Sequence, residues 1–408
     1  MKEFFKVETI QGVLAHAPSF SKVDTETVSL ADCLGRVTAE DVYSDVDIPD
    51  FNRSTMDGFA VKASSTFGAS EANPAYLNVR GHIRMGGRPD FSIGPGEAAR
   101  IATGGMLPEG ADSVIMVEYT DALDDTTIEA YRSVAPGQHV IEKGEDIRHT
   151  QPALKAGTRI RPQEAGLLAA CGRTETTVFR RPRVGIISTG DEVVPVDQVP
   201  GEGQIRDINT QTLSGQVLAA GGMPMVFGIV RDNRDDLMDK CRRALESTDM
   251  VMISGGSSVG ARDFTVEVLD ALPDTAILVH GISISPGKPT ILARSSGKAF
   301  WGLPGHAVSA MVVFAVVVRP FLDRLCGRSQ TVRQFPVQAV LNRNLASAQG
   351  RVDYVRVRLV EVDGQPMADP VLGKSGLINT MVKADGLIAI GMNTEGLEKG
   401  TVVRVMPL

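Results

Sequence analysis

Cysteine is scarce in this sequence, and the four cysteines that are present lie far apart, at Cys33, Cys171, Cys241 and Cys326. This spacing has neither the density of a disulfide framework nor the CxxC pattern of a metal site. We therefore expect all four cysteines to be reduced and mostly structural.

Long apolar runs and targeting signals are also missing. The longest apolar stretch, residues 307–318, includes Ser309, stops at Arg319-Pro320 and is too short to span a bilayer, so it predicts a buried helix. The first residues, MKEFFKVETIQ, interrupt any apolar core with charges and offer no small-residue cleavage site. These absences predict a cytoplasmic protein without membrane attachment.

The sequence has no excess of positive charge. Its 42 Lys and Arg residues against 49 Asp and Glu residues give a net charge of −7, which argues against nucleic-acid binding. An anionic ligand would have to be held locally by loop N–H groups, a few cationic side chains or a bridging divalent cation. The 408 residues, of which 43% are hydrophobic, predict a globular chain of about two to four domains.

Strand and helix patterns alternate between residues 183 and 325. Short apolar runs such as VGIIS and MVMIS are separated by amphipathic segments such as NRDDLMDKCRRALE. This alternation predicts a parallel sheet covered on both faces. Four glycine-containing loops follow its strands, and ligands bind at the carboxyl ends of strands in such sheets, so we expect one shared site. The loops are STGDE (188–192), SGGSSVG (254–260), SPGKP (285–289) and LPGH (303–306).

The loop SGGSSVG has the composition of a phosphate-binding turn. Gly255, Gly256 and Gly260 permit positive φ, while successive N–H groups and the start of the following helix attract an anion. The loop matches neither the Walker A pattern nor GxGxxG. An ordinary strand-to-helix turn would explain it equally well if it stood alone, and the three companion loops favour a ligand.

Acidic residues accompany these loops. Asp191 and Glu192 end a strand, and Asp263 opens the helix after the glycine loop. Carboxylates facing a phosphate loop would repel the ligand unless Mg²⁺ lay between them. The alternatives are a helix N-cap for Asp263 and a surface ion pair for Glu192.

Lys288 lies between Pro286 and Pro289 in a stiff loop, which would place its ammonium group well for an oxyanion. A solvated lysine in a proline turn is the alternative.

The segment FNRSTMDGFA (51–60) carries more polar residues than a turn requires. The turn itself needs only Asp57-Gly58, and surplus polar side chains are typical of functional loops. The stretches ATGGMLPEGADSVIMVE (102–118) and KGEDIR (143–148) add Thr103 and Asp146 as further candidates, with Thr103 ranked lower.

Seven motifs in this order and spacing resemble the molybdopterin molybdenumtransferase family, which includes MoeA and the gephyrin E domain. They are NRSTMDGFA, ATGGMLPEGADSVIMVE, GEDI, STGDE, SGGSSVG, SPGKP and GLPGHAVSA. The resemblance covers essentially the whole chain. It implies an enzyme that takes molybdopterin-AMP and molybdate, cleaves the phosphoanhydride with a divalent ion such as Mg²⁺, inserts the metal and releases AMP.

The resemblance also implies site residues by position. The catalytic acids would be Asp57, Asp146, Glu192, Asp232 and Asp263. The metal would be held by Asp191, Glu192 and Asp263. The pterin nucleotide would be held by Thr189, Gly190, Ser254, Gly255, Gly256, Ser258, Gly260, Pro286, Gly287, Lys288, Pro304 and Gly305.

The implied fold is a multidomain α/β fold with four domains. Residues 1–44 and 147–180 would form an elongated dimerisation domain interrupted by a β-rich insert at 45–146. Residues 181–328 would form the α/β molybdopterin-binding domain, and 329–408 a β-barrel-like domain. In the implied homodimer, the insert of one subunit faces the α/β site of the other. Further partners would be a separate molybdopterin-adenylylating protein and molybdoenzyme acceptors.

Several motif positions depart from the family pattern. Ser257, Ser285, Ile208 and the pair His306-Ala307 replace the usual residues of GGVSVG, KPGKP, GxIxxSN and GLPGNPVSA. Ser285 removes a cation where an oxyanion would lie, and a protonated His306 would restore part of that charge, although a neutral packing histidine is the alternative. These departures leave open whether the protein uses molybdate or tungstate.

Two other functions remain open from the sequence. A non-catalytic scaffold could use the same dimer, as the gephyrin E domain does, although a scaffold need not retain the clustered acids. A pterin- or nucleotide-binding relative that adenylylates or hydrolyses is a further alternative, but this chain has no second nucleotide-binding domain.

Overall fold

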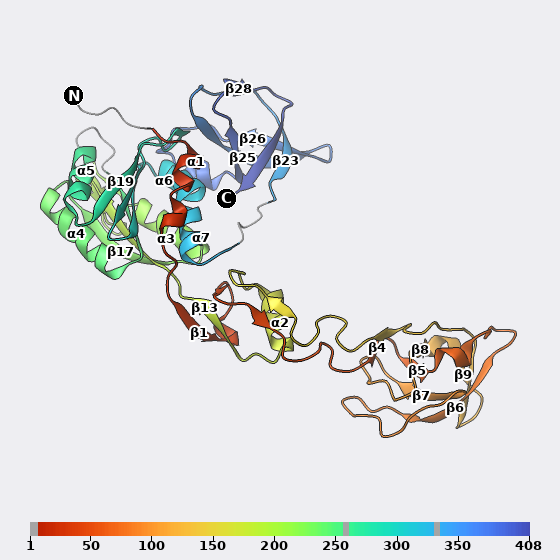
Figure 1. Cartoon of the computed structure of the whole chain (residues 1–408). Helices are drawn as coiled ribbons and strands as arrows, with labels where there is room; N and C mark the ends of the chain where they lie inside the picture. The colour runs from red at the N-terminus through yellow and green to blue at the C-terminus, as the bar shows by residue number, and fades with distance from the viewer. Residues whose placement is uncertain (1–6, 256–260, 330–334) are drawn as a thin grey trace.

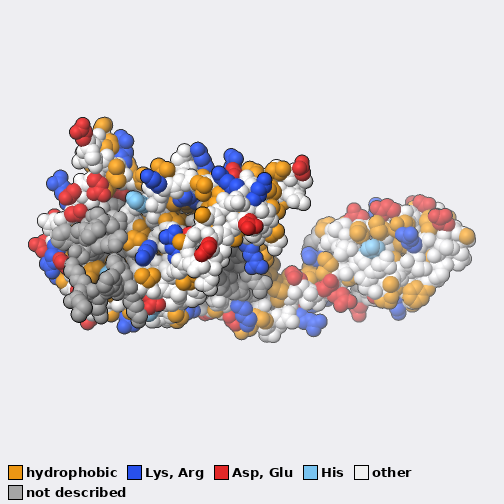
Figure 2. All heavy atoms as spheres, turned by 90° about the horizontal axis from the view of Figure 1, so that it is seen from above, with side chains coloured by type: hydrophobic (Ala, Val, Ile, Leu, Met, Phe, Trp, Pro, Cys, Tyr) orange, Lys and Arg blue, Asp and Glu red, His pale blue; other side chains and the backbone are white. Residues whose placement is uncertain are grey.

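The computed structural model describes residues 7–255, 261–329 and 335–408, with the side chains of 261–264 outside the description. The chain is elongated (Figure 1). An α/β domain and a β-barrel lie together at one end, and a small three-stranded sheet joins them to a β-rich insert at the other end. Viewed from above, the insert forms a separate lobe (Figure 2). The multidomain α/β fold expected from the sequence is therefore confirmed.

The α/β domain is built on a six-stranded sheet. In spatial order its strands are β17 (Met223–Val230), β14 (Arg183–Thr189), β18 (Met250–Ser254), β22 (Lys298–Leu303), β21 (Ile291–Ser295) and β19 (Thr275–His280). Helices α3 (Asn209–Ala219) and α6 (Ala307–Val313) cover one face, and α4 (Arg234–Ser247) and α5 (Ala261–Ala271) cover the other.

The predicted parallel sheet is only partly parallel. The strands from β17 to β22 are parallel, but β21 runs antiparallel to both of its neighbours. The cause is the short turn Ser296-Gly297, whose two residues have φ of 49° and 77°. Two consecutive residues with positive φ form the tight turn that joins antiparallel strands.

The buried helix predicted for residues 307–318 is present but extends further. Helix α6 continues through a π-helical segment (Phe314–Val318) into α7 (Arg319–Leu325). Pro320 lies just after the π-helical segment, inside this continuous helix, where a proline cannot donate the usual backbone hydrogen bond and a local irregularity is expected. No helix in the described part of the chain is long and apolar enough to cross a membrane.

The N-terminal residues belong to two cores. Helix α1 (Ile10–Leu14) and the 3-10 turn Ala17–Ser19 lie against the α/β domain, where Val13 and Phe20 are buried. The chain then enters the sheet β1 (Thr25–Ser29), β13 (Glu175–Phe179) and β2 (Val37–Thr38), which packs with α2 (Pro162–Ala170). The domain boundaries expected at residues 44, 146 and 180 remain predictions.

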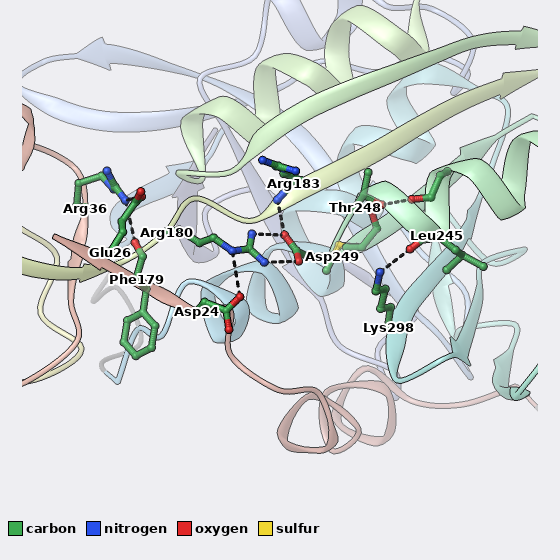
Figure 3. Close-up of polar contacts among 12 residues, drawn as sticks. Asp24, Glu26, Arg36, Phe179, Arg180, Arg183, Leu245, Thr248, Asp249 and Lys298 are labelled. Atoms are coloured by element: carbon green, nitrogen blue, oxygen red, sulfur yellow. Dashed lines mark hydrogen bonds and ion pairs between the residues drawn. The ribbon is translucent and has the colours of Figure 1, made fainter. Parts of the chain in front are cut away.

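Polar contacts hold the three-stranded sheet to the α/β domain (Figure 3). Arg180, just after β13, donates two hydrogen bonds of 2.7 Å to the carboxylate of Asp249, which also accepts one from the N–H of Arg183. Burial acts to raise the pKa of Asp249, but these donors outweigh it and hold the pKa below its usual value. A charge-assisted bidentate pair of this kind fixes orientation as well as distance.

The insert is reached through a two-stranded ribbon of β3 (Val42–Tyr43) and β12 (Pro152–Leu154). Its six-stranded sheet has the order β8 (Ser113–Met116), β5 (Gly58–Val61), β7 (Glu97–Ile101), β6 (Ala75–His82), β10 (Thr127–Ala130) and β9 (Thr120–Ala122). A second ribbon pairs β4 (Arg53–Ser54) with β11 (Val140–Ile141).

The C-terminal sheet closes into a barrel. Strands β25 (Val352–Val362), β26 (Gln365–Pro370), β23 (Val337–Leu341), β29 (Val402–Pro407) and β27 (Gly386–Ile390) follow one another, and β25 pairs with β27 to complete the ring. The short strand β20 (Ile284–Ser285) of the α/β domain also joins this sheet, where it pairs in parallel with β25. Helix α6 packs against this barrel through Val308 and Val312. The four cysteines are all buried and unbridged.

Candidate functional site

The carboxyl ends of β14, β18 and β22 surround a cleft of about 280 Å³. Three of the four predicted loops contribute to its lining. The predicted site residues that line it are Thr189, Gly190, Glu192, Asp232, Ser254, Gly255 and Gly305. The sequence therefore located the cleft, while the roles assigned to these residues remain predictions.

Two glycines allow the strand ends to approach closely. Gly255 has φ of +120°, and a Cβ there would lie 2.1 Å from the carbonyl oxygen of Thr189. Gly190 has φ of +139°, and a Cβ would lie 2.6 Å from Oε2 of Glu192. Any other residue at either position would strain the backbone and displace its neighbour. The glycines thus set the width of the floor of the cleft.

Three carboxylates gather at one side of the cleft. Burial raises the pKa of Asp232, and the nearby charges of Asp191 and Glu192 raise it further. The N–H of Asp232 donates to Oδ1 of Asp191 at 3.2 Å. Like charges held together in this way disfavour ionisation unless a cation joins them. The cluster therefore has the electrostatic character of a cation site.

The predicted metal ligands are only partly described. Within residues 7–255, 261–329 and 335–408, no three His, Cys, Asp or Glu side chains are arranged to hold a metal ion. The side chain of Asp263 lies outside the description, as do Gly256, Ser258, Gly260 and Ser257. The three-ligand set of Asp191, Glu192 and Asp263 remains a prediction.

The loop LPGH joins the cleft to the barrel. His306 lines the cleft beside Gly305, and its Nδ1 lies 2.8 Å from Oγ of Ser375 in the C-terminal domain. Gly376 of the same domain also lines the cleft. Pro304 does not line it, whereas Ala307 does and is buried. A contribution from the C-terminal domain was not expected from the sequence.

The loop SPGKP does not line the cleft among the described residues. It begins in β20 and leads into β21, whose first residue, Ile291, pairs with Gly302 of β22. Gly287 packs closely under helix α6, where a Cβ would lie 2.4 Å from Val313, and Pro286 follows a cis bond. Lys288 is exposed.

Asp57 lies in the insert rather than at the cleft (Figure 1). Its Oδ1 accepts hydrogen bonds from the backbone N–H of Thr103 at 2.7 Å and from the Thr103 hydroxyl at 2.9 Å. The backbone bond and then the hydroxyl bond lower the pKa of Asp57. Thr103, which the sequence ranked low, is therefore the residue that orients this carboxylate.

The three predicted motifs of the insert meet at this place. Oδ1 of Asn52 accepts from the N–H of Lys143 at 2.8 Å, which ties FNRSTMDGFA to KGEDIR. Ser54 exchanges backbone hydrogen bonds with Gly104 and Gly105 of ATGG. Asp146 is held by a backbone bond from its N–H to the carbonyl of Ile48, and its side chain is exposed. The insert thus carries a second cluster of candidate residues.

Sequence reasoning missed a buried polar network beneath the cleft. Its members Ser188, Asp207 and Thr210 lie where β14 ends or α3 begins. Half-buried Asn209 donates beside it to the carbonyl oxygen of Gly305. The signal was present in RDINT, where an acidic residue three positions before a threonine precedes a helix, a pattern typical of helix capping.

The fold is that of a multidomain α/β protein with a cleft at the strand ends of its open sheet. Family models match three successive parts of the chain. They are the MoeA N-terminal region (domain I and II) at residues 6–172, a probable molybdopterin binding domain at 185–324, and the MoeA C-terminal region (domain IV) at 338–408. The chain belongs to the MoeA family, as its motifs predicted.

Curated relatives match over nearly the full length. A putative molybdopterin biosynthesis protein of Methanocaldococcus jannaschii is 36% identical over 93% of this chain and 91% of its own length. A molybdopterin molybdenumtransferase of Bacillus subtilis is 33% identical over 94% of this chain and 90% of its own length.

Solved structures share the whole architecture. A molybdopterin biosynthesis MoeA protein from Pyrococcus horikoshii OT3 has a TM-score of 0.86 at 29% identity, covering 99% of this chain and 100% of that one. A second such structure, from Pyrococcus horikosii, has a TM-score of 0.79 at 37% identity, covering 98% and 99%.

Proposed function

We propose that this protein is a molybdopterin molybdenumtransferase, which inserts molybdenum into molybdopterin during molybdenum cofactor biosynthesis. Near full-length similarity to relatives of that name supports this function. The observation that carries it is the cleft itself, where three predicted family loops meet at the ends of β14, β18 and β22.

The substrate in this proposal is molybdopterin-AMP, with molybdate as the second substrate and AMP as a product. Gly190 and Gly255 let the strand ends form the floor on which the nucleotide part lies, and the buried hydroxyls of Thr189 and Ser254 bind and orient it. Lys288 is proposed to hold the oxyanion from its own loop. Pro286 and Gly287 position that lysine, and Pro304 positions Gly305.

A divalent cation, proposed as Mg²⁺, is held by Glu192 and Asp191 together with Asp263. The grouping of Asp232 with Asp191 and Glu192 supports a cation there: burial raises the pKa of Asp232, the two neighbouring charges raise it further, and a bound cation would favour the ionised form. When bound, the ion would neutralise charge on the phosphoanhydride. The carboxylates of this chain hold and orient that ion, and the wall of the cleft excludes water.

The working unit is proposed to be a homodimer with composite sites. Asp57 and Asp146 lie in the insert lobe, separated from the cleft of their own chain by the three-stranded sheet (Figure 1). A second copy would bring these acids to the cleft. The proposed location is the cytoplasm, with a molybdopterin-adenylylating protein before this step and molybdoenzymes after it.

The test is to incubate the protein with molybdopterin-AMP, molybdate and Mg²⁺, and to follow AMP release and reconstitution of a cofactor-free molybdoenzyme. Both products are expected, and Glu192→Gln should lower both. Asp270→Asn, which removes an exposed carboxylate of α5 away from the cleft, serves as the matched control and should leave both rates unchanged.

The outcomes separate the competing functions. AMP release without active cofactor would indicate a hydrolase, and neither product would indicate a scaffold. Replacing molybdate by tungstate in the same assay determines which oxyanion the protein uses.

A further inference from the structure

Asp207 is the centre of a buried polar network under the floor of the cleft. The residue is 7% exposed, and its Oδ1 accepts from the Ser188 hydroxyl and from the N–H of Thr210, each at 3.0 Å. Its Oδ2 accepts from the Thr210 hydroxyl at 2.5 Å. The carboxylate lies at the start of α3, where a helix favours negative charge. Asp207 also lines the cleft itself.

The network extends from Asp207 to Ser254, the first residue of the glycine loop. The Ser188 oxygen lies 3.0 Å from the Thr210 hydroxyl and 3.4 Å from the Ser254 hydroxyl. Ser254 lines the cleft yet is only 1% exposed, so it meets only a group that reaches the floor.

The donors are assigned by counting protons. A carboxylate oxygen accepts, and each hydroxyl has one proton to donate. Ser188 and Thr210 both give theirs to Asp207, so neither donates to another oxygen, and the 3.0 Å contact between their own hydroxyl oxygens carries no proton. The contact between Ser188 and Ser254 therefore requires Ser254 as the donor. Because Ser254 donates its hydroxyl proton to Ser188, only its lone pairs remain to interact with a group in the cleft.

We propose that Asp207 is a positioning residue that orients the Ser254 hydroxyl, through Ser188, as a hydrogen-bond acceptor for an N–H or O–H group of the ligand. This proposal rests on the proposed function, which supplies a ligand rich in amino, ring N–H and hydroxyl donors. The glycine loop that contains Ser254 was expected to bind a phosphate. An ionised phosphate oxygen has no proton to donate, so the proposal instead pairs Ser254 with an N–H or O–H group of the ligand.

The experiment measures binding of molybdopterin-AMP, without molybdate or divalent ions so that no turnover occurs. Asp207→Asn keeps the oxygen that accepts from the Thr210 N–H and from Ser188, but it turns the acceptor of the Thr210 hydroxyl into an amide donor. The released Thr210 proton then points to Ser188 and competes with Ser254 for the lone pairs of that oxygen. We expect the dissociation constant to rise about tenfold, the size of one hydrogen bond. Ser254→Ala should give a similar rise. Ser214→Ala, which removes a hydroxyl of α3 that makes no hydrogen bond, is the control and should leave binding unchanged.

Combining the substitutions distinguishes positioning from general disruption. If Asp207 acts through Ser254, Asp207→Asn has no further effect on binding in the Ser254→Ala background. Ser188→Ala interrupts the relay while leaving both Thr210 contacts, and it should reproduce the loss even if Asp207→Asn folds poorly.

Each outcome has a distinct meaning. Equal binding by the wild-type protein and both relay variants would overturn the proposal, as would an Asp207→Asn loss that is unchanged in the Ser254→Ala background. Failure of the wild-type protein to bind molybdopterin-AMP would instead refute the proposed function.

Discussion

The cleft and the insert both present acidic side chains, but their electrostatic states are opposite. At the cleft, burial and then the charges of Asp191 and Glu192 raise the pKa of Asp232, which disfavours its ionised form. In the insert, two donors from Thr103 lower the pKa of Asp57. The first arrangement favours a cation, and the second is an oriented carboxylate that stays ionised. This contrast supports the proposal that the two regions supply different halves of one site.

The largest expected effect tests whether those halves meet between subunits. Asp57→Ala and Glu192→Ala should each lower AMP release by about a hundredfold, since each removes a charged group from every site. When the two inactive chains are mixed and allowed to exchange, activity should return to about a quarter of the wild-type value, because half of the dimers are mixed and each has one intact site.

The measurement is AMP release before and after exchange, with exchange verified by mass spectrometry of differently tagged chains. No recovery after verified exchange would mean that each site is built within one chain. As the control, each variant is taken through the same exchange alone, and its AMP release should stay at the inactive level.

A smaller effect would sharpen the electrostatic description of the cleft. Glu192→Gln keeps the shape of the side chain while removing one charge, so the Mg²⁺ concentration for half-maximal AMP release should rise about tenfold. The same substitution should lower the pKa of Asp232, because one of the neighbouring charges that raise it is lost. Titration of Mg²⁺ gives the first quantity, and NMR titration of the Asp232 carboxyl carbon gives the second. An unchanged Mg²⁺ requirement would remove Glu192 from the cation site.

The smallest effect concerns the insert. Thr103→Val removes the hydroxyl bond to Asp57 but leaves the backbone bond, so the pKa of Asp57 should rise only part of the way toward its ordinary value. A lowered carboxylate pKa stabilises the fold above the ordinary pKa, and this contribution disappears as the pH falls through the lowered value. NMR titration of Asp57 measures the change, and Thr103→Ser should restore the wild-type titration. Identical curves for all three proteins would show that the hydroxyl does not orient Asp57.

The sequence predicted the elements of the α/β domain well because hydrophobic periodicity and glycine punctuation are local. It placed Thr189, Glu192, Ser254 and Gly305 at one edge because strand ends converge there by topology. It did not predict the antiparallel hairpin of β21 and β22. The two residues Ser296-Gly297 were the available signal for that hairpin. The loop SPGKP, which leads into β21, does not line the cleft among the described residues, and its role remains a prediction.

Other parts of the site depend on contacts that no local pattern encodes. The bond from Thr103 to Asp57 joins residues 46 positions apart, and the contact of His306 with Ser375 spans 69 positions. The network of Asp207 needs β14, β18 and α3 to be packed before its members touch. Such pairings follow from the complete fold, so residue composition alone ranks Thr103 low and passes over Asp207.

The contribution of Gly376 to the cleft has a consequence for synthesis of the chain. Gly190 and Gly255 are translated before Gly376, so the wall that includes Gly376 emerges from the ribosome after the glycine loops. Domains generally fold in order as they emerge, so the nascent α/β domain can form while its cleft is still open on that side. A chain that stopped before Gly376 would carry these two glycines without the enclosure they serve.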